Sequence, residues 1–92
     1  MKVLPKFKIC FGRIGRTLVC QDDVGTIYFS FDISPAESHA KEKWKLHLDP
    51  RPLTQVGDKL DYASNTDRER VAIALEEAKA YSAGRGYLVE SA

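Results

Sequence analysis

One segment, Thr66 to Gly84, constrains the fold more than any other part of this sequence, because it is the only stretch that predicts a long helix. Thr66 and Glu69 have the spacing of a capping box, in which each side chain satisfies a backbone donor at the start of a helix. Gly84 and Gly86 can adopt positive φ and end it. Residues at spacings of three and four gather on one face, namely Val71, Ala74, Leu75, Ala78, Tyr81 and Ser82. Any sheet in this chain must bury its apolar face against that side of the helix.

Two apolar residues of the helix, Ile73 and Ala80, fall on the side away from this face. Single exposed aliphatic side chains are common on monomeric proteins and need no special function. The alternative is that Ile73 and Ala80 contact a second copy of the chain or another partner. A homodimer through these two residues therefore stays open.

Alternating apolar and polar residues predict five strands, at Lys6 to Phe11, Arg16 to Gln21, Thr26 to Ile33, Lys43 to Leu48 and Gly86 to Glu90. The third of these is expected at the centre, since its apolar face is the most complete. In the fourth, Trp44 is expected to point to the core together with two leucines.

The remaining segments predict loops. The polar stretch from Ser34 to Glu42 follows the third strand, and the prolines at 50 and 52 end the fourth, because proline cannot donate to a ladder. Leu53 to Asn65 is expected to be a long loop. The prediction is a single α+β domain over residues 1–92, with the order β-β-β-β-α-β. It has a four- to five-stranded, mainly antiparallel sheet whose one face packs on the helix while the other faces water.

Composition and charge exclude several classes. The 92 residues suffice for one core, and no apolar run approaches the roughly 20 residues needed to span a bilayer. The N-terminal residues lack the apolar region of a signal peptide, so we expect a cytoplasmic protein. The net charge of +1 gives no strong field toward nucleic acid or membrane.

The cysteine and histidine content predicts neither a metal site nor a cofactor. Cys10 and Cys20 lie in strands joined by a tight turn, so a disulfide between them is geometrically conceivable. A cytoplasmic setting favours two buried or half-buried thiols instead. With no CxxC spacing and two histidines, no zinc site is predicted, and the GRIG turn lacks a nucleotide-binding fingerprint.

The candidate working surface is the sheet face that the helix leaves open. The partner-binding residues predicted on this face or at its margin are Lys6, Lys8, Tyr28, Asp32, Lys43, Lys45, His47 and Arg51. A solvated face of mixed charge is what any antiparallel sheet needs for solubility. The functional alternative is a docking surface for an acidic partner protein.

A catalytic or nucleic-acid-binding use of the same face is the competing hypothesis. His47, Lys45 and Asp32 would form an acid–base group for RNA cleavage if they converged, and the basic first hairpin would favour nucleic acid. No nucleophile motif or spaced pair of carboxylates supports an enzyme, and no aromatic stacking signature supports RNA binding. We therefore expect a non-catalytic protein.

The second half of the chain resembles small bacterial immunity proteins of polymorphic-toxin systems. The similarity lies in Trp44, the break HLDPRP at 47–52, and the segment TDRERVAIALEEAKAYSAGRGYLVE that follows a long loop. It covers residues 44–90. The resemblance implies a non-catalytic protein that binds and blocks a toxin. One departure is the charge, since inhibitors of nuclease toxins are typically acidic.

Overall fold

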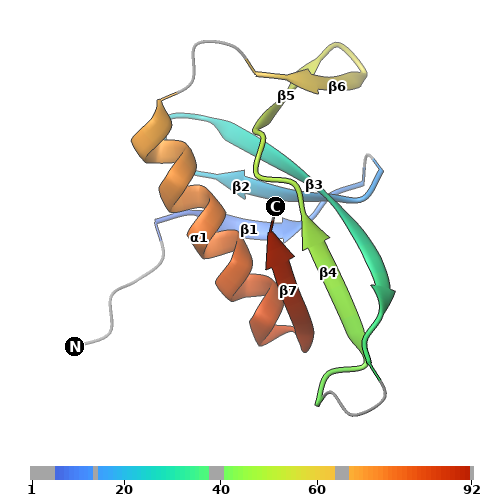
Figure 1. Cartoon of the computed structure of the whole chain (residues 1–92). Helices are drawn as coiled ribbons and strands as arrows, with labels where there is room; N and C mark the ends of the chain where they lie inside the picture. Colours follow the sequence, from blue (N-terminus) through green and yellow to red (C-terminus); the bar gives the residue numbers. More distant parts are fainter. Residues whose placement is uncertain (1–5, 14, 38–40, 64–66, 92) are drawn as a thin grey trace, which may run out of the picture.

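The computed structural model describes residues 6–13, 15–37, 41–63 and 67–91, and folds as one curled sheet around one helix (Figure 1). The helix α1 spans Arg68–Gly84. The strands are β1 (Lys8–Phe11), β2 (Thr17–Gln21), β3 (Thr26–Pro35), β4 (Trp44–Leu48), β5 (Leu53–Val56), β6 (Lys59–Tyr62) and β7 (Tyr87–Ser91). The α+β class, the single helix and the mainly antiparallel sheet are thus as predicted. The described residues form seven strands, more than the four to five expected.

The sheet has the order β1-β2-β3-β4-β7 and is organised around the long strand β3. The first half of β3 pairs with β2, and its second half pairs with β4 on the other side. All pairs are antiparallel except β4 with β7, which run parallel. A parallel pair needs a long crossover, and here α1 and the β5–β6 hairpin provide it. The prediction that the chain leaves the sheet at Ser34 was wrong, since β3 continues through Pro35.

The segment from Leu53 is not a loop, which corrects the prediction for 53–65. It forms the β5–β6 hairpin, and a single register contact between Leu53 and Tyr28 attaches the hairpin to β3. Gly57 opens the tight turn with a φ of 65°, a conformation that glycine adopts without strain. Positions 64 and 65 of the predicted loop lie outside the described residues.

The core lies between α1 and the concave face of the sheet. Phe29 and Phe31 of β3 are buried in one cluster with Ala74 and Ala78 of the helix, as the periodicity predicted. The other buried apolar residues of this cluster are Phe7, Leu18, Cys20, Ile27, Leu46 and Leu48. Small residues on the helix let its backbone approach the sheet closely.

Two apolar residues lie differently from the prediction. Trp44 is 49% exposed, because it stands at the start of β4, opposite Tyr87 of β7 and level with the C-terminal end of the helix. Ile73 is half-buried and packs against the core. One turn further along, the carboxylate of Glu77 accepts hydrogen bonds from the backbone N–H groups of Lys6 and Phe7. The segment that leads into β1 therefore covers part of the helix side that was expected to face water.

The helix begins with a cap on Asp67, whose side chain accepts hydrogen bonds from the backbone of Glu69 and Arg70. Thr66, the predicted cap, lies outside the described residues. Arg70 then joins the first helical turn to the β2–β3 turn, where its guanidinium donates to both carboxylate oxygens of Asp22. This ion pair is largely buried and ties helix to sheet.

The two cysteines lie on opposite faces of the sheet. Cys20 is fully buried beneath the helix, whereas Cys10 is exposed, and both are free thiols. Cys10 pairs with Val19 rather than with Cys20. A disulfide is therefore absent from this pair, and the expectation that both thiols are at least half-buried is wrong for Cys10. None of the helices in the described part of the chain is long and apolar enough to cross a membrane.

Candidate functional site

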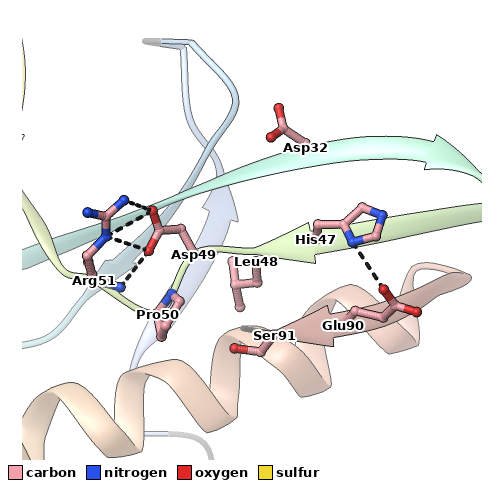
Figure 2. Close-up of a pocket in the computed structure, with 8 residues that line it drawn as sticks. All are labelled: Asp32, His47, Leu48, Asp49, Pro50, Arg51, Glu90 and Ser91. Carbon is pink, nitrogen blue, oxygen red and sulfur yellow. Dashed lines mark hydrogen bonds and ion pairs between the residues drawn. The ribbon is translucent and has the colours of Figure 1, made fainter.

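The most prominent concavity is an open hollow at the ends of the parallel strands β4 and β7 (Figure 2). It has a volume of about 700 Å³ and is lined by Asp32, His47, Leu48, Asp49, Pro50, Arg51, Glu90 and Ser91. The hollow exists because β4 ends at Leu48 and the following proline segment turns away toward β5. At the same level β7 also ends, so among the described residues the sheet continues past this point through β3 and not through β4 or β7.

One wall of the open hollow is a clamp between Arg51 and Asp49. The guanidinium Nη2 lies 2.9 Å from Oδ2 of Asp49, and Nε lies 3.2 Å from Oδ1. The Arg51 side-chain hydrogen bond lowers the pKa of Asp49, and the same bond raises the pKa of Arg51. The guanidinium also stacks over the ring of Tyr62, with 4.5 Å between its carbon and the ring centroid. Arg51 is therefore charged and held in one place.

The other wall includes His47 and Glu90. Together with Ser34, which lies outside the lining, they form a line of hydrogen-bonded side chains from adjacent strands that we call the Ser34–His47–Glu90 row. Oγ of Ser34 on β3 lies 2.9 Å from Nε2 of His47 on β4. Nδ1 of the same ring lies 3.1 Å from Oε2 of Glu90 on β7. Figure 2 shows the ring pointing toward Glu90 from the neighbouring strand. Glu90 also pairs with Lys45, whose Nζ is 3.4 Å from Oε1.

The partners of His47 determine where its proton lies when the ring is neutral. A carboxylate accepts hydrogen bonds and donates none, so Nδ1 carries the proton toward Glu90. Nε2 is then an acceptor for the hydroxyl of Ser34. The row is open to solvent, since the side chains of His47 and Glu90 are 43% and 48% exposed.

The eight predicted partner-binding residues do not form one cluster. Asp32, His47 and Arg51 line the open hollow, and Lys45 flanks it. Asp32 lies directly opposite His47 in the register, but the hydrogen bonds of the ring go to Ser34 and Glu90.

The other four predicted residues lie elsewhere. Lys6 and Lys8 border a separate hollow beside Asp22 and Asp23. The hydroxyl of Tyr28 lies 3.2 Å from Oε1 of Gln55 on the hairpin. Lys43 precedes β4 and is exposed. Two of the predicted lysines therefore stand next to carboxylates of the neighbouring turn and far from the open hollow in the strand order.

The sequence prediction missed Ser34, Asp49, Glu90 and Ser91. Ser34 was assigned to a loop, and Glu90 could be placed beside His47 only by knowing that β7 pairs with β4 in parallel. The alternation along each strand is the one signal that could have indicated them, because it puts Ser34 and Glu90 on the open face. Among the described residues, no group of three or more histidine, cysteine and acidic side chains could hold a metal ion.

Neither a protein-family model, nor a curated protein, nor a solved structure matches this chain. The fold defines a small α+β domain with one sheet face that the helix leaves uncovered. The case for a function therefore depends on the geometry of that face.

Proposed function

We propose that this chain is a protein-binding domain that docks its uncovered sheet face on another protein, as an inhibitor of the immunity type would. The observation that carries the proposal is the open hollow together with the charged side chains already held around it. Binding loses less entropy where side chains are ordered beforehand. The Arg51–Asp49 clamp is ordered in this sense by three bonds to one carboxylate and by its stacking on Tyr62.

Tyr62 supplies an apolar anchor next to the open hollow. It is 56% exposed and carries Arg51 above its ring, and the exposed Val56 lies on the same hairpin. Tyrosine and arginine are the residue types that contribute most at the centres of protein interfaces. An aromatic ring and a fixed guanidinium beside a concavity therefore favour a protein partner.

The charges around the open hollow favour a partner with basic side chains, in contrast to the acidic partner that the lysines in the sequence suggested. The carboxylates of Asp32, Asp49 and Glu90 face two cations, Arg51 and Lys45, both of which are already paired. A phosphate backbone would meet this excess of carboxylates, which argues against nucleic acid as the partner at this place. A lysine or arginine of a partner protein would instead find acceptors there.

The test is protection from a toxin encoded beside this chain, measured by bacterial growth and by calorimetry with the purified toxin domain. Wild-type protein should restore growth and bind with a 1:1 ratio. Replacing Tyr62 by Ala should weaken binding by about 2 kcal/mol, roughly thirtyfold. Asp32→Lys should also weaken binding, because the new lysine would repel a basic side chain of the partner.

Glu76→Lys is the matched control, since Glu76 is an exposed carboxylate on the helix, away from the sheet face. This variant should bind like wild type. Loss of binding in Glu76→Lys with full binding in both sheet-face variants would place the interface on the helix and refute the proposal. Light scattering of the chain alone tests the alternative of a homodimer through Ile73 and Ala80. A dimer held by this surface should dissociate in the Ala80→Glu variant.

A further inference from the structure

We propose that the Ser34–His47–Glu90 row makes Ser34 a nucleophile toward small activated esters. The row has the order of a nucleophile, a base and an orienting carboxylate, with 2.9 Å between Oγ and Nε2 and 3.1 Å between Nδ1 and Oε2. This order, rather than any sequence spacing, is what defines serine–histidine–acid chemistry on unrelated folds. The activity goes beyond protein binding and needs no partner protein.

The three strands explain why the row is aligned. His47 and Glu90 are direct register partners across the parallel pair, and Ser34 is a diagonal neighbour of His47 across the antiparallel pair. All three side chains therefore emerge on the same face. Because sheet backbone is rigid compared with loops, the register itself holds the groups within hydrogen-bonding distance.

The reaction proceeds in two steps, acylation of Ser34 and hydrolysis of the acyl ester. Oγ of Ser34 attacks the acyl carbon while its proton passes to Nε2 of His47, and Glu90 stabilises the imidazolium through Nδ1–H. His47 then returns this proton to the departing alkoxide, which leaves as an alcohol and yields an acyl ester on Ser34. In the second step, water gives a proton to His47 and its hydroxide adds to the acyl carbon. Ser34 regains its proton and the carboxylic acid is released.

The surroundings set the substrate class and the rate. Ser34 does not line the open hollow, which reaches the row only at His47 and Glu90, so an ester would lie on the open sheet face over Ser34. The ammonium of Lys45 is paired with Glu90 on β7, so it does not serve as a free cation for the oxygen that becomes negative. Since His47 is nearly half exposed, water screens these interactions, and the expected reaction is slow. Activated esters with good leaving groups are therefore the substrates that such a site takes.

The experiment is covalent labelling of the full chain with a fluorophosphonate, read by intact mass and by peptide mapping. Wild-type protein should form one adduct, on Ser34, as the Oγ–phosphorus bond forms and fluoride leaves. Ser34→Ala should abolish it, and His47→Gln should slow it at least about tenfold, since a positioned general base contributes roughly a hundredfold or more. Glu90→Gln should slow it severalfold, because it keeps the shape but removes the charge.

Ser30→Ala is the control, since Ser30 lies on the same strand and face, opposite Thr17 rather than near a histidine. It should label like wild type. Absence of an adduct, an adduct at another residue, or equal rates in wild type and His47→Gln would each overturn the proposal. Partner affinity is measured separately, so failure here leaves the proposed binding function standing, and failure of binding leaves this one standing.

Discussion

Replacing Leu46 by Ala tests the central claim that one helix and the concave sheet face share a single core. Leu46 is fully buried at the middle of β4, between its register partners Ile33 and Val89. Truncation of a buried leucine costs about 2–5 kcal/mol, because the transfer energy is lost and a cavity remains. A chain of 92 residues has about 5–14 kcal/mol of stability. A loss of about 3 kcal/mol would lower Tm by about 12–24 °C.

Urea denaturation followed by the fluorescence of Trp44, the single tryptophan, measures this loss directly. The transition midpoint should fall while the m-value stays the same. Val56→Ala is the control, since Val56 is 61% exposed and its truncation should change the free energy of unfolding by less than about 0.5 kcal/mol. If Leu46→Ala lost less than about 1 kcal/mol, or no more than the control, the helix would not be packed as described.

Three further predictions follow from other contacts. The Arg70 hydrogen bond lowers the pKa of Asp22 below its ordinary 3.8, so the unfolded state binds the proton more readily and this stabilisation is lost as the pH falls below about 4. Asp22→Asn should flatten the loss of Tm between about pH 5 and pH 2, roughly the range where the carboxyl takes up its proton in the unfolded state while it stays ionised in the folded state; an unchanged dependence of Tm on pH would disprove the Arg70–Asp22 ion pair. Burial raises the pKa of Cys20 to about 12, and the thiolate is the reactive form. A thiol reagent should therefore modify Cys10 in the native protein and Cys20 only in urea, and two fast thiols would contradict the burial. Gly57→Ala should lower the stability by about 1 kcal/mol, because its φ of 65° disfavours a side chain; calorimetry showing an unchanged Tm would refute the turn.

The elements with a strong local period were predictable. The helix face that carries Ala74 and Ala78 follows from spacing alone, and the alternation in Thr26 to Ile33 correctly placed Phe29 and Phe31 on the buried face. The β5–β6 hairpin was missed because the adjacent prolines indicated a loop, and because its residues alternate less clearly.

The candidate site was predictable only in part, because its halves come from distant segments. Asp32, His47 and Arg51 were assigned to one surface and do line one hollow. Glu90 meets His47 across 43 positions of sequence, through a parallel pairing that no local pattern announces. The neutralisation of Lys45 by Glu90 was unpredictable for the same reason.

The pattern of apolar residues is enough to give the period of each element and to show which side chains of a strand share a face. Both depend on backbone geometry within a few residues. The three-dimensional fold adds which strands are neighbours, that β4 and β7 run parallel, and that Ile73 packs half-buried against the core. The physical reason is that register between distant strands depends on how the helix fills the concave face. The set of side chains on the open sheet face depends on that register, so local patterns in the sequence do not give it.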